Sequence, residues 1–241
     1  MVHKMLLRTA VVFLAFSAML TAQTLDELLQ KNYAARGGLD KIKAVKTLKL
    51  KGTMMMQGME MEMQIMIKRP NKVRSEMTMQ GQSIITATDG EKGWMVNPMA
   101  GSTEPQEIPK EQLKKTKDQS NIEGTLVTYK EDGTTLKLLG KEKLEGSDVF
   151  HIEATTKDSV VRHIYLDVKS CLETMMKTTV SAQGQTMDVF TIQSNFKTVA
   201  GVKFAHTTEA KVNGETAAKT EFKKIEVNVP IPDSIFVMPA K

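Results

Sequence analysis

Cysteine, aromatic residues and blocks of like charge are all scarce in this sequence. The 241 residues include one cysteine, Cys171, and aromatic residues make up 5% of the chain. A lone cysteine excludes an internal disulfide and a cysteine-based zinc site. Lysine and arginine number 33 against 28 acidic residues, but they are spread along the chain. Because no block of five or more like charges occurs, we expect no nucleic-acid partner.

The short motifs of common enzymes are also missing. The chain has no G-x-S-x-G, no H-E-x-x-H, no Walker loop and no G-x-G-x-x-G. Glu60 and Glu62 share a strand face whose other residues are polar, which indicates a solvated surface. His151 and His163 fall on adjacent predicted strands, a pattern more typical of a cross-strand polar pair than of an acid–base site. We therefore expect no catalytic residues, no metal site and no cofactor, and a protein that is not an enzyme.

The first residues have the features of an export signal. Lys4 and Arg8 precede an uncharged apolar run between residues 9 and 20, and Ala22 offers a small residue for cleavage. The run of about 12 residues is shorter than the roughly 20 that a membrane-spanning helix needs. We expect residues 1–22 to be a signal peptide, cut near Ala22, and residues 23–241 to form one domain. Because no cysteine stands at the cleavage point to be acylated, the mature protein is expected to be soluble.

One amphipathic helix is predicted at the start of the mature chain. Thr24 and Glu27 form a capping box, in which each side chain satisfies an unpaired backbone N–H. Gly37 and Gly38 supply a residue that can turn left-handed and end the helix. Apolar side chains repeat at helical spacing between these signals, at Leu25, Leu28, Leu29 and Tyr33.

From residue 46 onward the apolar period changes from 3.6 to 2. Alternating segments separated by turns such as Asp132-Gly133 and Asn213-Gly214 predict an antiparallel meander, a sandwich or a barrel. Residues 125–129 are predicted as one of these strands. Residues 97–121 break the rhythm with three prolines, which predicts a loop and a short polar helix, residues 110–117, inserted across the sheet.

Methionine is concentrated on one predicted strand face. Nine of the 18 methionines lie between residues 54 and 79. Methionine is flexible and polarizable, so such a face suits a cavity that accepts acyl chains, although ordinary core filling explains it equally well. The candidate lipid-binding residues are Met59, Met61, Met63, Ile65, Met77, Met79 and Trp94.

A copper site is an alternative interpretation of the same strand. The thioethers of Met59, Met61 and Met63 share one face, and soft thioethers select Cu(I). Against this, no histidine or cysteine is nearby in the sequence, and successive residues on one strand face lie roughly 6.5–7 Å apart.

Five stretches, in order, resemble the periplasmic lipoprotein-sorting proteins of Gram-negative bacteria, the LolA/LolB-like group. They are residues 35–52, 89–94 (Asp-Gly-Glu-Lys-Gly-Trp), 139–150 (beginning Leu-Gly-Lys-Glu-Lys-Leu-Glu-Gly), 164–167 (Ile-Tyr-Leu-Asp) and 196–239. Each stretch is loose by itself, and their order and spacing carry the resemblance.

The resemblance implies a half-open antiparallel barrel of about 11 strands, closed on one side by helices. It also implies a periplasmic carrier of lipoprotein acyl chains or another lipid, with membrane-bound donor and acceptor proteins as partners. The helix with Leu25, Leu28, Leu29 and Tyr33 and residues 105–117 would be lid elements, and Arg69 and Arg74 are candidates for the arginine that latches the lid. A sensor or scaffold on the same fold, with its cavity filled by its own side chains, is the other alternative.

Overall fold

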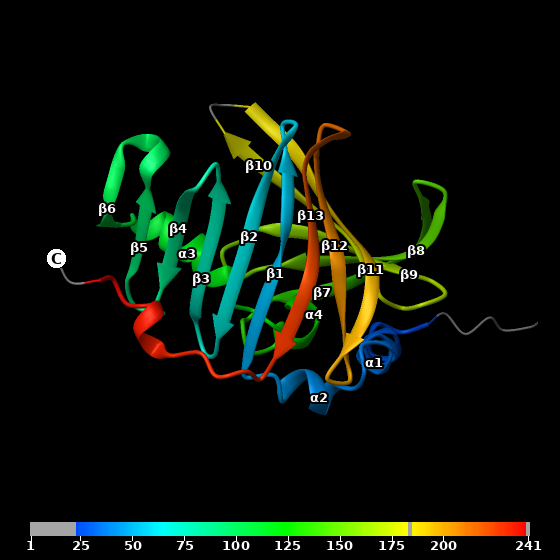
Figure 1. Cartoon of the computed structure of the whole chain (residues 1–241). Helices are drawn as coiled ribbons and strands as arrows, with labels where there is room; N and C mark the ends of the chain where they lie inside the picture. The colour runs from blue at the N-terminus through cyan, green and yellow to red at the C-terminus, as the bar shows by residue number, and fades with distance from the viewer. Residues whose placement is uncertain (1–22, 183–184, 240–241) are drawn as a thin grey trace, which may run out of the picture.

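One antiparallel sheet of thirteen strands makes up most of the molecule (Figure 1). This computed structural model describes residues 23–182 and 185–239, so the predicted signal peptide lies outside the described residues. The strand order is β6-β5-β4-β3-β2-β1-β13-β12-β11-β10-β9-β8-β7, and each half of the sheet is a meander of chain neighbours. The pairing of β1 with β13 joins the two halves, while β6 and β7 are free edges. The expected half-open antiparallel sheet is confirmed, with thirteen strands where about 11 were expected.

The strands and helices have the following bounds. The strands are β1 (Thr47–Met56), β2 (Met59–Lys68), β3 (Lys72–Met79), β4 (Gln82–Thr88), β5 (Gly93–Asn97), β6 (Ser102–Glu107), β7 (Thr135–Leu144), β8 (Ser147–Thr155), β9 (Val161–Asp167), β10 (Glu173–Ala182), β11 (Gln185–Val199), β12 (Val202–Val212) and β13 (Glu215–Val227). The helices are α1 (Leu25–Ala35), α2 (Leu39–Lys43), α3 (Lys110–Asp118) and α4 (Thr125–Thr128), with short 3-10 turns η1 (Pro98–Ala100) and η2 (Asp233–Ile235).

Helix α1 begins and ends where its sequence signals predicted. The Glu27 backbone N–H donates to Thr24 Oγ1 at 3.3 Å, and the Thr24 N–H donates to Glu27 Oε2 at 3.0 Å, which completes the capping box. Gly37 follows with φ +114° and lies so close to β12 that a Cβ there would be 2.0 Å from the Gly201 carbonyl oxygen. The helix therefore ends at a position that only glycine can occupy.

Two local predictions in the middle of the chain were wrong. Residues 125–129 were predicted as a strand, but residues 125–128 form helix α4, because Leu126 and Val127 are buried among core residues contributed by α1. The Leu126 carbonyl accepts a hydrogen bond from Tyr33 Oη at 2.6 Å, so this backbone group has a partner outside any sheet. The predicted loop before α3 contains β6, which pairs with β5. The predicted polar helix is confirmed as α3, which contacts β3 and β4.

The main hydrophobic core lies where α1, α2 and α4 meet one face of the sheet, which is called the inner face from here on. Its buried residues are Leu28, Leu29, Tyr33, Ile42, Val45, Leu126, Val127, Phe150, Ile152, Ala154, Ile164, Leu166 and Val202. A second cluster continues along the inner face of β1–β3 and β13, through Leu48, Leu50, Ile67, Val73 and Ile225. Ile122, Phe204 and Val227 pack against both clusters, so the two clusters form one continuous core along the inner face.

The C-terminal segment crosses the opposite, outer face of the sheet, towards the viewer in Figure 1. Phe236 is fully buried there with Met66 and Ile231. The Trp94 indole Nε1–H donates to the Phe236 carbonyl oxygen at 2.9 Å, and the Arg74 guanidinium lies 5.3 Å from the Trp94 ring centre. These contacts attach the end of the chain to β2, β3 and β5.

Candidate functional site

Methionines form cross-strand rows on the inner face, away from the helices. Strand register places Met54 opposite Met61 and Met56 opposite Met59 between β1 and β2. Met63 lies opposite Met77 on β3, which in turn lies opposite Ile84 on β4. These six methionines are called the methionine rows. They share the inner face with Leu48 and Leu50 because side chains on a strand alternate between faces.

Exposure on this face is greatest at the β1–β2 turn, where Met56 is 37% exposed. Leu48, Ile67 and Val73 are buried in the cluster that packs against the α3–α4 loop residue Ile122, whereas Met63 and Met77 are half-buried. The Met61 side chain is buried at 6% exposure, whereas Met59, the first residue of β2, is 44% exposed. The helices thus cover only part of the inner face, and an apolar methionine surface extends beyond them to solvent.

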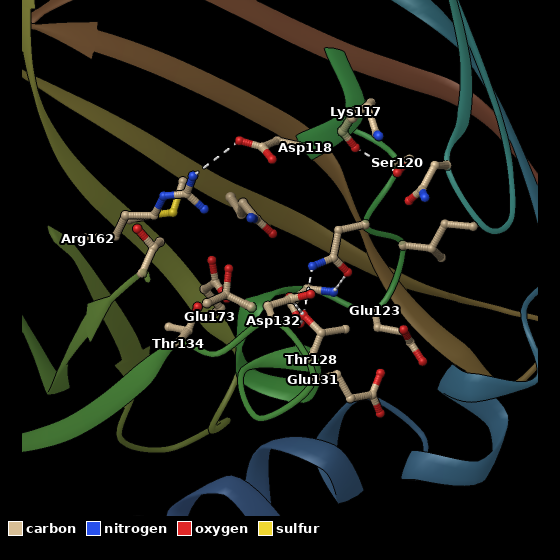
Figure 2. Close-up of a pocket in the computed structure, with 18 of the residues that line it drawn as sticks. Lys117, Asp118, Ser120, Glu123, Thr128, Glu131, Asp132, Thr134, Arg162 and Glu173 are labelled. Carbon is tan, nitrogen blue, oxygen red and sulfur yellow. Dashed lines mark hydrogen bonds and ion pairs between the residues drawn. The ribbon is translucent and has the colours of Figure 1, made fainter. Parts of the chain in front are cut away.

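A cavity of about 990 Å³ lies on the same side of the sheet, nearer the helices. Figure 2 shows side chains from the α3–α4 loop, α4 and β9–β10 pointing into it. Its wall carries apolar groups from Ile122, Met176, Phe196 and Phe204. The wall also contains thirteen charged residues, which are Arg36, Arg69, Lys114, Lys117, Asp118, Glu123, Glu131, Asp132, Lys157, Asp158, Arg162, Glu173 and Lys203. The cavity therefore combines apolar and charged walls, which an amphipathic ligand would match.

Ion pairs tie separate chain segments together around this cavity. Arg69, in the β2–β3 turn, reaches Glu123 Oε2 with Nη1 at 3.0 Å and donates from Nε to the Val45 carbonyl at 2.6 Å. The Arg36 Nη1 group donates to the Glu123 carbonyl at 2.6 Å. Arg162 on β9 lies 3.7 Å from Asp118 at the end of α3. Arginines thus hold the α3–α4 loop to the end of α1 and to the β2–β3 turn, and hold the end of α3 to β9.

Two charged groups at the cavity are held away from bulk water. Burial lowers the pKa of the Arg36 guanidinium, and the nearby Glu173 carboxylate acts in the opposite direction. Burial raises the pKa of the Glu173 carboxyl, while Arg36 opposes that rise. The two groups therefore stabilise each other's charged forms in a site that disfavours both.

The predicted lipid-binding residues do not all meet in space. Met59, Met61, Met63, Ile65, Met77 and Met79 lie on the inner face of β2 and β3. Trp94 lies on the outer face, 3% exposed beneath the C-terminal segment. None of the seven lines the 990 Å³ cavity as the described residues define it. The methionines and isoleucine lie on the same side of the sheet as that cavity, whereas Trp94 lies on the opposite side.

The predicted lid residues belong to the main core. Leu28, Leu29 and Tyr33 are buried in it, and Leu25 packs against its edge. Of the two candidate latch residues, Arg69 contacts the helical layer and Arg74 contacts the C-terminal segment through the Ile235 carbonyl at 3.0 Å. Only Arg69 is therefore placed to connect the sheet with the α3–α4 loop.

Sequence reasoning missed the charged cavity residues, which come from distant parts of the chain. Arg36, Glu123 and Glu173 have no shared motif or spacing that marks them. Arg162 did carry a signal, because it takes the inner-face position in the alternating run that continues with Ile164 and Leu166. A charged side chain at such a position needs a partner or a ligand.

A family model described as "Outer membrane lipoprotein carrier protein LolA" matches residues 56–207, more than half of the chain. The match runs from the end of β1 into β12 and includes most of the cavity wall. No curated protein has a significantly similar sequence. None of the helices within the described residues has the length and apolar character to cross a bilayer.

Several solved structures share the fold at low sequence identity. The LolA superfamily protein NE2245 from Nitrosomonas europaea has a TM-score of 0.57 at 14% identity, covering 90% of this chain and 98% of that one. A domain assigned to outer membrane lipoprotein sorting from Vibrio parahaemolyticus has a TM-score of 0.57 at 13% identity, covering 87% and 94%. A DUF1329 family protein from Desulfovibrio piger has a TM-score of 0.57 at 10% identity, covering 87% and 97%. Identities this low show a common architecture.

Proposed function

We propose that this chain, which belongs to the LolA family of outer membrane lipoprotein carrier proteins, is a soluble periplasmic carrier that binds lipoprotein acyl chains or another lipid. The observation that carries the proposal is the methionine rows, an apolar inner surface that the helices leave partly open to solvent. In this proposal the protein catalyses no reaction. Residues 1–22 are its export signal, and the remaining residues form one lipid-binding domain.

The hydrophobic effect would drive acyl chains onto the methionine rows. Each methylene removed from water contributes about 0.8 kcal/mol, so ten buried methylenes contribute about 8 kcal/mol. Methionine side chains adjust to chains of differing length and shape because they have three rotatable bonds. A surface that is partly solvated before binding also permits release to an acceptor.

The charged cavity would receive the polar end of the same cargo. Phe204 lines the cavity and packs in one cluster with Phe222. Phe222 lies opposite Gly52, which lies opposite Met63 in the methionine rows. An amphipathic molecule could therefore lie with its chains on the rows and its polar group among Arg36, Arg162 and Glu173.

Native mass spectrometry of the protein purified from periplasm without detergent tests this function. A bound species with the mass of a lipid or an acylated peptide supports the carrier. Bound copper with no lipid would favour the thioether alternative. A ligand-free protein that also fails to bind a fluorescent fatty acid after delipidation would contradict the proposal and leave a sensor or scaffold.

A further inference from the structure

Two histidines meet on the outer face of the sheet, on the side away from the cavity and the methionine rows. His151 on β8 and His163 on β9 alternate with the inner-facing core residues Ile152 and Ile164. His151 Nε2 lies 2.9 Å from His163 Nδ1, and the ring centres are 5.0 Å apart. The Tyr165 ring packs against His151 with the centres 4.6 Å apart. Packing against Tyr165 thus limits the orientations open to the His151 imidazole.

A carboxylate determines which nitrogen of His151 is free. His151 Nδ1 is 3.2 Å from Glu142 Oε1 on β7, so Nδ1–H donates to the carboxylate. The neutral imidazole then has its lone pair on Nε2, directed at His163 Nδ1. A histidine whose second nitrogen donates to a carboxylate is the arrangement that orients imidazole ligands on metal ions.

We propose that His151 Nε2 and His163 Nδ1 form a binding site for a divalent transition-metal ion that prefers imidazole, Zn²⁺ or Cu²⁺. Two nitrogens at about 2.0–2.1 Å from a tetrahedral ion lie about 3.3 Å apart. The observed separation of 2.9 Å needs to open by a few tenths of an ångström, and each ring must also turn so that its lone pair points at the ion and not along the N–N line. The proton of neutral His163 moves from Nδ1 to Nε2 when the ion takes its place.

Water supplies the remaining ligands of this site. No group of three or more histidine, cysteine, aspartate or glutamate side chains within the described residues is placed to hold a metal ion. The site is therefore open, with two protein nitrogens and exchangeable positions. Glu153 lies opposite His163 in the strand register and adds negative charge beside the ion.

The charges facing the pair from neighbouring strands favour a cation. Glu142 and Glu153 both act on His151, and Asp188 on β11 faces His163. Lys177 on β10 is the cross-strand neighbour of His163, but its ammonium is held by Asp188 at 2.7 Å. Burial lowers the pKa of His151, which keeps its ring neutral and available near neutral pH. Metal affinity should fall in acid as a proton competes with the ion for His151 Nε2.

Titration of metal into the mature chain tests the site, with Cys171→Ser as the background so that the free thiol cannot bind the ion. We expect one Zn²⁺ per chain by calorimetry. For Cu²⁺ at the same stoichiometry, we expect electron paramagnetic resonance to show two coordinated nitrogens. His151→Gln and His163→Gln should each weaken binding at least about tenfold, and Glu142→Gln should also weaken it about tenfold or more. His206→Gln is the matched control, since His206 is buried on β12 with its Nδ1 bonded to the Phe222 carbonyl.

A circular dichroism melt of every variant separates loss of the site from loss of the fold, and exposed Glu60→Gln replaces the control if His206→Gln does not fold. Absence of stoichiometric binding, a spectrum with one coordinated nitrogen, or equal affinity in His151→Gln and the control would overturn the site and leave a structural histidine pair. Lipid binding is measured separately and does not decide this result.

Discussion

Replacing one inner-face methionine by glutamate tests where acyl chains bind. Met63 lies in the middle of the methionine rows, between Gly52 and Met77, and is half-buried. A Met63→Glu carboxylate with its hydration shell would displace about three methylenes of a bound chain, a loss of about 2.4 kcal/mol. Since about 1.4 kcal/mol corresponds to tenfold in affinity, binding should weaken about fiftyfold.

Met55 provides the matched control for this experiment. It lies on the outer face of β1, 44% exposed, between Glu60 and Lys219 on the neighbouring strands. A Met55→Glu carboxylate would meet one charge of each sign and remain in water, so lipid affinity should stay at the wild-type value. Met63→Leu should also bind nearly as well as the wild type, because it keeps the apolar surface.

Displacement of a fluorescent fatty acid measures these affinities, with circular dichroism as the check on folding. Equal affinity of Met63→Glu and the wild type would refute the placement of acyl chains on the methionine rows. The same conclusion would follow if Met55→Glu lost as much affinity as Met63→Glu. Failure of the wild type itself to bind any lipid would instead contradict the carrier function.

Three further perturbations concern stability. Phe236→Ala should lower the free energy of unfolding by about 3–5 kcal/mol, measured by urea denaturation, because it empties a fully buried site; a loss below 1 kcal/mol would show that the C-terminal segment contributes little. Thr24→Ala should cost about 1 kcal/mol through loss of the α1 cap, and an unchanged melting temperature would contradict this. Burial raises the pKa of the Glu173 carboxyl in the folded protein, so the folded state binds this proton more tightly than the unfolded chain does. The free energy of unfolding should therefore rise as the pH falls from that raised pKa to the unfolded value of about 4.3. Glu173→Gln should lose this rise in a pH series of melts, and an unchanged profile would assign the rise to other groups.

Local sequence signals predicted most of the elements because the forces that produce them are local. The capping box at Thr24 and Glu27 and the glycines after Ala35 placed α1 correctly. Strand alternation identified the inner-face methionines of β2 and β3. Residues 125–129 escaped the same reasoning, since their burial against α1 and the hydrogen bond from Tyr33 decide the helix, and neither is visible in a local window.

The candidate sites depended on contacts between distant residues. Trp94 was assigned to the lipid pocket from its type and position, but the register of β5 turns it to the outer face, under Phe236. Arg36, Glu123 and Glu173 meet at the cavity only after the sheet has curled and the helices have packed. Conversely, His151 and His163 could be paired from adjacent predicted strands, while their 2.9 Å contact needed the register.

The alternating strands, the capped first helix and the strand face on which methionine gathers could all be read from the order of the residues. Which surfaces face each other depends on the folded chain, because β1 pairs with β13 across most of the chain length. An alternating apolar pattern shows that neighbouring side chains point to opposite faces of the sheet, but it does not show which face is covered by other parts of the chain. That depends on where the helices and the C-terminal segment pack, which is a property of the whole chain.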